Sequence, residues 1–246
     1  MEARPWNQIP IRDNGEPLQG LPPDLLRIQP HPYQRLGAPY GVAASPFRLR
    51  SAVITRLLAA QATVQQHDPR WRVAIFDAWR PLAVQAFMVE QVIAQLCRER
   101  GIDAEQPSPG RQQVALEVGR FWAPPNLDPA APPPHSTGAA VDLTLARGTA
   151  RATPRLLAMG SAIDAIGPVS EPEHFAEQAG RVGDPRRRRR CLEWQARRDL
   201  LRRAMEGAGF VQHPNEWWHF SWGDQLWAWR SGAAQACYGR VGTAEG

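Results

Sequence analysis

Two short segments carry residues that could act together in catalysis. The aromatic segment NEWWHF holds Glu216 and His219, and the segment HSTGAAVDLTL holds His135 and Asp142. Imidazole nitrogens and carboxylate oxygens are ligands that zinc accepts in proteins. Two histidines and one aspartate make up the three protein ligands of a catalytic zinc site, which leaves Glu216 as the general base for water in the remaining position.

Each of these residues also has a simpler interpretation when taken alone. A lone histidine that follows prolines, such as His135, is most often a surface side chain. A lone strand aspartate, such as Asp142, is most often a hydrogen-bonding or surface group. Glu216 and His219 also fit a hairpin in the core, with a histidine whose hydrogen bonds are satisfied and a glutamate at the rim of the hairpin. The four residues together favour the zinc site.

The spacing of these residues constrains the backbone around them. Seven extended residues would separate His135 from Asp142 by roughly 23 Å, whereas both must lie about 2.0–2.2 Å from a shared zinc ion. The chain must therefore fold back, and Gly138 can adopt the positive φ of such a turn. In a regular strand Glu216 and His219 would point to opposite faces. We expect His219 on the strand and Glu216 at its bent start, with both reaching one cleft.

The segment FDAWRP places a cation at the exit of a predicted strand. Arg80 in this position could face the oxyanion that forms when a carbonyl group is attacked. The alternative is a structural arginine that pairs with Asp77, and the sequence leaves both interpretations open.

The elements that position these residues mix helices and strands without regular βαβ alternation, which indicates an α+β fold. A helix is predicted from Ser45 as cap and Pro46 as first residue, and another from Asp184 as cap, with Leu192 on its apolar face. The strand at 139–146 alternates between an apolar face and a face that carries Asp142. The remaining predicted elements are a strand at 71–76, helices at 81–100 and 109–122, and a hairpin at 209–223.

Length and composition describe a soluble globular chain. The 246 residues are 43% hydrophobic and 22% charged, and we predict a single domain over 1–246 with an irregular N-terminal arm at 1–44 and a C-terminal extension at 223–246. No stretch approaches the ~20 apolar residues of a membrane span, and the N-terminus has no apolar signal-peptide segment. With three scattered cysteines, the expected location is cytoplasmic, without a membrane partner.

The basic residues are all arginine, which excludes mechanisms that need a lysine, such as Schiff-base formation. The net charge of +5 is about the size of the run Arg186–Arg190. Because no nucleic-acid-binding motif accompanies this run, we predict no nucleic-acid partner. The run is interpreted as a solvated helix face, and a lid or a site for an acidic partner is the alternative.

The segments HSTGAAVDLTL, EWWHF and FDAWRP together resemble the D-alanyl-D-alanine dipeptidases, the VanX-like branch of the zinc D,D-peptidases in peptidase family M15. The similarity runs from about Pro39 to Trp222. It implies a small central antiparallel sheet flanked by helices, the Hedgehog/D,D-peptidase-like zinc fold, with one Zn²⁺ per chain. The family pattern implies these roles: His135, Asp142 and His219 as zinc ligands, Glu216 as catalytic base and acid, and Arg80 as transition-state stabiliser.

Two further positions follow from the same resemblance. The segment MGSAID, residues 159–164, matches a family element in which Ile163 replaces an aromatic residue. Asp164 then corresponds to a carboxylate expected near the free ammonium group of the substrate. Pro133 stands where the family often has a serine, so a contact to the substrate carboxylate is lost or supplied by another group.

We therefore predict zinc-dependent hydrolysis of D-alanyl-D-alanine, or a close D,D-dipeptide, to free amino acids by a water that Glu216 activates. One alternative is a D,D-carboxypeptidase or peptidoglycan endopeptidase with the same zinc site. Another, from a different class, is a non-catalytic zinc-bearing binding module. The predicted partner is a small D,D-dipeptide. The sequence does not distinguish antibiotic resistance, cell-wall peptide recycling and D-alanine scavenging, and it does not indicate an oligomeric state.

Overall fold

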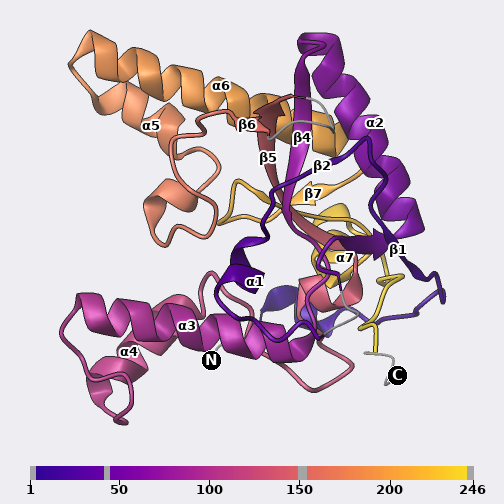
Figure 1. The fold of residues 1–246 in the computed structure, drawn as a ribbon, viewed down its shortest axis with the longest axis vertical. Helices are drawn as coiled ribbons and strands as arrows, with labels where there is room; N and C mark the ends of the chain where they lie inside the picture. The colour runs from indigo at the N-terminus through magenta and orange to yellow at the C-terminus, as the bar shows by residue number, and fades with distance from the viewer. Residues whose placement is uncertain (1–3, 42–44, 149–153, 243–246) are drawn as a thin grey trace.

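The centre of the protein is a six-stranded sheet, seen in a computed structural model that describes residues 4–41, 45–148 and 154–242 (Figure 1). The strand order is β2-β4-β5-β8-β7, and β6 pairs with β5. Strand β2 runs parallel to β4, and the other pairs are antiparallel. The α+β prediction with a small, mainly antiparallel sheet is confirmed. The strands are β2 (Leu26–Arg27), β4 (Trp71–Asp77), β5 (Ala140–Arg147), β6 (Arg155–Leu156), β7 (Val211–Gln212) and β8 (His219–Ser221).

Strand β5 lies in the middle of this sheet and is buried on both faces. Val141, Leu143 and Leu145 pack into the main hydrophobic core, as their alternation predicts. The opposite face carries Asp142 and Thr144, and both are also buried. The predicted alternation between an apolar face and a face that carries Asp142 is therefore confirmed. Other segments of the chain cover the second face and enclose a pocket that Asp142 lines.

Two long helices, α2 (Ser51–His67) and α6 (Pro185–Gly207), pack together and contribute to the main core with β4 and β5. The predicted start of α2 at Ser45 and Pro46 is wrong. Residues before Ser51 form β3 (Arg48–Arg50), which pairs antiparallel with β1 (Leu18–Gly20). Because these residues are extended, the helix begins only at Ser51. The predicted cap of α6 is confirmed, because the Asp184 side chain accepts hydrogen bonds from the N–H groups of Arg186 and Arg187.

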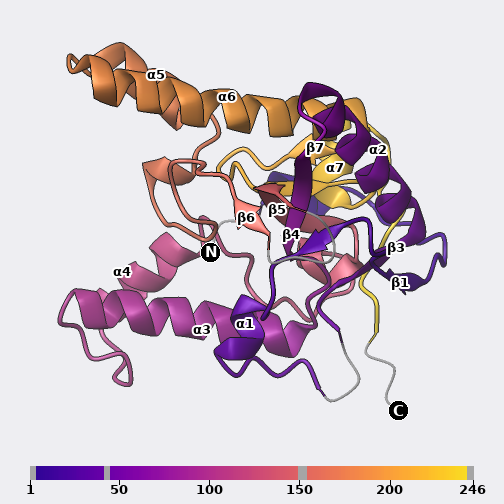
Figure 2. The ribbon, with the colours of Figure 1, turned by 45° about the horizontal axis from the view of Figure 1, so that its top comes forward.

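The N-terminal half of α6 extends beyond the sheet and packs on α5 (His174–Arg181), as Figures 1 and 2 both show. The arginines at 186–190 are exposed there, in agreement with a solvated helix face. Leu192 is 50% exposed, so its predicted place on the apolar face is wrong. The buried apolar residues of α6 toward its C-terminal end, Leu200, Leu201, Ala204 and Met205, belong to the main core.

Helices α3 (Leu82–Glu99) and α4 (Pro109–Val118) pack against each other in a second hydrophobic core, to which residues of the N-terminal arm also contribute. Both helices were predicted, but α4 ends four residues before the predicted end at 122. Ser108 caps α4 by accepting a hydrogen bond from the N–H of Arg111. None of the helices in the described segments has the length and apolar character that crossing a lipid bilayer requires.

The N-terminal arm is more ordered than the predicted irregular segment. It holds η1 (Pro5–Gln8), β1, β2 and α1 (Pro32–Arg35), and β2 joins the central sheet. The C-terminal extension forms α7 (Gln225–Ser231), which contacts η1. Residues 1–3 and 42–44 of the arm and 243–246 of the extension lie outside the described residues. The division into one domain with an arm and an extension stays a prediction.

Candidate active site

The register of the central strands places three acidic and imidazole side chains next to one another. Asp142 on β5 stands directly opposite His219 on β8 and, on its other side, opposite Asp77 at the end of β4. Directly opposed residues on one face of an antiparallel pair have Cβ atoms about 4.5–5.5 Å apart. Residues that are 77 positions apart in the sequence, Asp142 and His219, therefore become neighbours.

His135 reaches the same place through the predicted turn. The chain forms a short 3-10 helix, η2 (Pro134–Thr137), and Gly138 then adopts a left-handed conformation with φ of 71°. This turn directs the chain into β5 and returns Asp142 to the side of His135. The backbone N–H of Arg80 donates a 3.1 Å hydrogen bond to the carbonyl of His135, which ties the turn to the exit of β4.

Gly138→Ala is expected to destabilise the protein. A left-handed φ costs a residue with a Cβ atom roughly 1–2 kcal/mol, and the added methyl group would overlap Cδ2 of Leu18. Urea denaturation should show a loss of at least that size. Gly180→Ala is the matched control, because a Cβ atom at this position of α5 meets no atom within 4 Å. Equal stability of the two variants would contradict the interpretation of the turn.

The imidazoles of His135 and His219 and the carboxylate of Asp142 form one buried cluster. His135 Nε2 lies 3.2 Å from one Asp142 oxygen, and His219 Nδ1 lies 3.0 Å from the other. The two ring nitrogens are 3.2 Å apart. One ligand atom from each residue fits within a mutual distance of 4.8 Å. The structure therefore brings together the three residues that were predicted to bind one metal ion.

The outer hydrogen bonds of the two imidazoles indicate that this donor set fits zinc. His135 Nδ1 lies 2.7 Å from the carbonyl oxygen of Ala78, to which it can only donate, so in the neutral imidazole the lone pair is on Nε2. His219 Nε2 contacts the hydroxyl of Ser221 at 3.4 Å, which leaves Nδ1 toward the cluster. Two nitrogen lone pairs and a carboxylate that converge in this way suit a tetrahedral cation with an open position.

Glu216 lies beside this cluster, in the turn between β7 and β8. Its carboxylate is 3.7 Å from His219 Nδ1 and 4.0 Å from His213 Nδ1. Burial, and then the negative charge of Asp142, raise the pKa of Glu216 to about 8. The expected arrangement, with His219 on the strand and Glu216 at its bent start, is what the structure shows.

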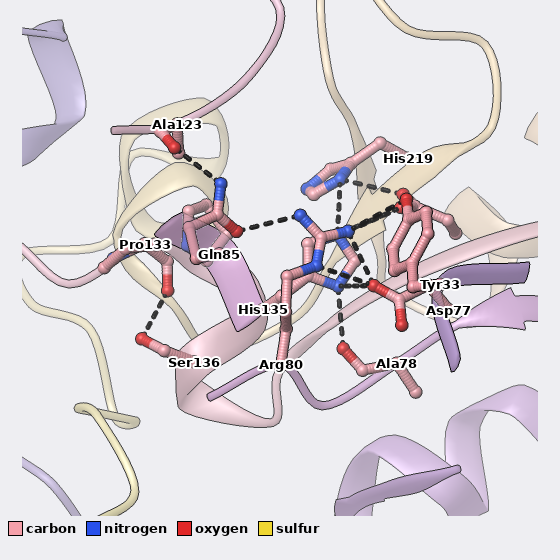
Figure 3. A network of polar contacts seen from close by, with 12 residues as sticks. Tyr33, Asp77, Ala78, Arg80, Gln85, Ala123, Pro133, His135, Ser136 and His219 are labelled. Atoms are coloured by element: carbon pink, nitrogen blue, oxygen red, sulfur yellow. Dashed lines mark hydrogen bonds and ion pairs between the residues drawn. The ribbon is translucent and has the colours of Figure 1, made fainter. Parts of the chain in front are cut away.

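Arg80 is held by several partners at the exit of β4, and Figure 3 shows its guanidinium group at the centre of this network. It forms a 2.6 Å ion pair with Asp77, donates a 2.8 Å hydrogen bond to Gln85 and lies 3.5 Å from a carboxylate oxygen of Asp142. Gln85 in turn donates to the carbonyl of Ala123 at 2.5 Å. The pairing with Asp77 exists, as the structural alternative required, and Arg80 also lines the pocket.

Asp164 occupies another part of the same pocket. Its backbone is left-handed, with φ of 64°, and the hydroxyl of Tyr33 donates a 2.7 Å hydrogen bond to its carboxylate. Burial, and then the charge of Asp142, raise the pKa of Asp164 to about 8. Tyr33 comes from α1, so a residue of the N-terminal arm completes this part of the site.

The loop that carries Asp164 is organised by the buried side chain of Arg198 on α6. Its guanidinium group donates to the carbonyls of Met159, Glu171 and Val169 and to the hydroxyl of Ser161, all at 2.9–3.0 Å. The indole of Trp217 donates to the same Ser161 hydroxyl at 2.9 Å. These bonds hold both ends of the loop and thereby set the position of Asp164.

Arg198→Lys is expected to lower the free energy of unfolding by about 2–4 kcal/mol, because one ammonium group cannot reach four separate acceptors and buried groups left unsatisfied cost about 1–3 kcal/mol each. Urea denaturation measures the loss. Arg203→Lys is the control, since Arg203 is an exposed arginine of the same helix. A difference of less than about 0.5 kcal/mol between the variants would show that the loop does not depend on Arg198.

Several pocket residues were not predicted as site residues from the sequence. Arg4, Gln85 and His213 line the same pocket as the predicted residues. Tyr33 and Asp77 form a hydrogen bond and an ion pair with predicted residues, Asp164 and Arg80 respectively. Asp77 lies within the motif FDAWRP, and His213 lies three residues before EWWHF, so their places in the sequence were a signal for them. Arg4 and Tyr33 carry no such signal, because they belong to the N-terminal arm.

Comparison with known proteins agrees with this geometry. A family model described as D-Ala-D-Ala dipeptidase, peptidase M15, matches residues 27–236. A D-alanyl-D-alanine dipeptidase of Synechocystis sp. is 40% identical, in an alignment of 246 positions that covers 97% of this chain and 97% of the relative. The matched region is wider than the similarity from Pro39 to Trp222 that the motifs indicated.

Proposed function

Because this chain belongs to the peptidase M15 family of D-Ala-D-Ala dipeptidases, we propose that it hydrolyses D-alanyl-D-alanine, or a close D,D-dipeptide, to free amino acids. The observation that carries the proposal is the convergence of His135, Asp142 and His219 within 4.8 Å, with Glu216 beside them. These three residues would hold one zinc ion. A zinc ion there would act as a Lewis acid that polarises the scissile carbonyl and lowers the pKa of a water molecule.

Glu216 is the proposed general base and acid. It is buried at the edge of the cluster, close enough to His219 to reach a water molecule at the reacting centre. In its ionised form, Glu216 accepts a proton from that water and returns it to the amine of the departing amino acid, so the residue ends each turnover ionised again. The aromatic residues around it, including Trp218, limit the access of bulk water.

Arg80 is proposed to stabilise the negative charge that develops on the carbonyl oxygen. Its guanidinium group is fixed by Asp77 and Gln85, so no reorganisation is needed when the charge appears. Because Asp77 occupies two of its N–H groups, the side chain is a preorganised donor with a set direction. Asp164, held by Tyr33, is proposed to pair with the ammonium group of the dipeptide.

Metal analysis combined with a hydrolysis assay tests the proposal. The protein should contain about one zinc per chain and should cleave D-Ala-D-Ala faster than L-Ala-L-Ala. Preferential cleavage of a peptidoglycan pentapeptide ending in D-Ala-D-Ala would favour the D,D-carboxypeptidase alternative. Bound zinc without hydrolysis of any D,D-peptide would favour the binding module. The cytoplasmic location stays a prediction, for which cell fractionation is the measurement.

A further inference from the structure

The N-terminal arm is anchored against the site by residues from the other end of the chain. Trp6 is buried, and its ring lies 5.6 Å from the rings of both His213 and Trp229. The buried side chain of Gln225 on α7 donates hydrogen bonds to the carbonyls of Ile9, at 2.6 Å, and Asn7, at 3.3 Å. These contacts fix the segment η1 and, with it, the residue that precedes it.

That preceding residue, Arg4, extends a half-buried guanidinium group into the lining of the active-site pocket. Its Cζ atom lies 5.5 Å from the centre of the Trp6 ring. Within the described part of the chain, its one hydrogen bond is a long contact of 3.5 Å to the carbonyl of Gly119, and it forms no ion pair with a carboxylate. By contrast, the guanidinium group of Arg80 in the same pocket is held by Asp77 and Gln85. Arg4 therefore retains donors for a ligand.

Two arginines and two carboxyl groups are distributed along the pocket in a way that matches a small zwitterion. They are Arg4, Arg80, Glu216 and Asp164. Arg4 lies over the ring of Trp6, which contacts His213, and His213 Nδ1 is 4.0 Å from Glu216, so Arg4 belongs to the end of the pocket where the β7–β8 turn lies. Asp164 lies on the side of Arg80, because the Tyr33 hydroxyl that donates to Asp164 also accepts a 3.4 Å hydrogen bond from Arg80. The guanidinium group of Arg4 and the carboxyl group of Asp164 thus flank the candidate metal cluster.

The direction of the proposed reaction determines which end of a dipeptide meets Arg4. Glu216 returns a proton to the departing amine, so the departing C-terminal amino acid must lie at the Glu216 end of the pocket. The free carboxylate of that amino acid then falls on the side of Arg4. The ammonium group of the other amino acid falls on the side of Asp164.

We propose that Arg4 binds the C-terminal carboxylate of the substrate, so that Arg4 and Asp164 hold the two charged ends of an unblocked dipeptide on either side of the scissile bond. The inference rests on the proposed dipeptidase function. It assigns recognition of the substrate carboxylate to Arg4, which precedes the region 27–236 that matches the family model. It also predicts that a C-terminal amide, which removes the negative charge, is a poor substrate.

The test compares Arg4→Gln with the unaltered protein on D-Ala-D-Ala and on its C-terminal amide. A charge-assisted hydrogen bond contributes about 1.5–3 kcal/mol, so Arg4→Gln should lower kcat/KM for the free acid by about 10- to 100-fold, mainly through KM. The same substitution should change kcat/KM for the amide by less than about 2-fold. Arg4→Lys, which retains the charge, should recover part of the loss. Arg12→Gln, an exposed arginine of the same arm, is the control and should match the unaltered protein.

The outcomes separate this inference from the proposed function. An unchanged KM of Arg4→Gln for D-Ala-D-Ala, in a preparation whose unaltered form is active, would overturn the role of Arg4 alone. An equal loss of kcat/KM on the free acid and the amide would also overturn it, because Arg4 would then affect the shape of the pocket without binding the carboxylate. Failure of the unaltered protein to cleave either compound would overturn the proposed function and this inference together.

Discussion

Glu216→Gln is expected to lower kcat for D-Ala-D-Ala by about 10²–10⁴-fold, the usual effect of removing a general base. Glutamine occupies nearly the same volume but cannot accept the proton of water or return it to the leaving amine. The zinc content should stay at one ion per chain, because the carboxylate of Glu216 stands outside the cluster formed by His135, Asp142 and His219. Steady-state kinetics and metal analysis on the same preparation make the two measurements.

The control for this variant is Glu206→Gln, which removes an exposed carboxylate of α6. It should retain the kcat of the unaltered protein. The role of Glu216 is refuted if Glu216→Gln also hydrolyses D-Ala-D-Ala at that rate. Loss of zinc from Glu216→Gln would instead indicate that Glu216 supports the metal site, which would change its proposed role from base to ligand.

His135→Ala is expected to abolish both metal binding and hydrolysis. Loss of a residue that merely orients a ligand already costs about 10- to 100-fold in metal affinity, so loss of a ligand nitrogen should cost more. His135 is a cleaner choice than Asp142, since Asp142 also lies 3.5 Å from the guanidinium group of Arg80. Zinc titration into the metal-stripped protein, followed by an activity assay, measures the effect.

His67→Ala provides the matched control, because His67 is an exposed histidine at the end of α2. This variant should bind zinc and cleave D-Ala-D-Ala as the unaltered protein does. Full zinc occupancy in His135→Ala, with activity retained, would show that the three residues do not act as one metal site. Circular dichroism of both variants checks that the fold is unchanged.

Local features of the fold could be read from the sequence because they depend on nearby residues. The alternation of Val141, Leu143 and Leu145 identified β5, and Asp184 before Pro185 marked the start of α6. The helix at Ser45 was placed wrongly because a cap and a proline signal a start that tertiary pairing can delay. Residues 48–50 pair with β1, and no local sequence pattern predicts that pairing.

The candidate site also combines features that the sequence indicated with features that depend on the tertiary structure. The residue types and short spacings around His135, Asp142, Glu216 and His219 indicated the chemistry, and Gly138 indicated the turn. Their convergence depends on strand register, in which Asp142 stands opposite His219 across two strands that are far apart in the chain. The roles in catalysis and metal binding stay predictions until the variants are measured.

The sequence by itself determined the kinds of reactive groups in this protein, the turn that brings His135 back toward Asp142, the helices α2, α3, α4 and α6, and the strands β4 and β5. These follow from backbone preferences and side-chain periodicity over a few residues. The tertiary structure alone decided that Tyr33 holds Asp164, that Arg80 lies between Asp77 and Asp142, and that Arg4 reaches the pocket. Such contacts join distant segments, and they arise from the packing of the whole chain rather than from any local pattern.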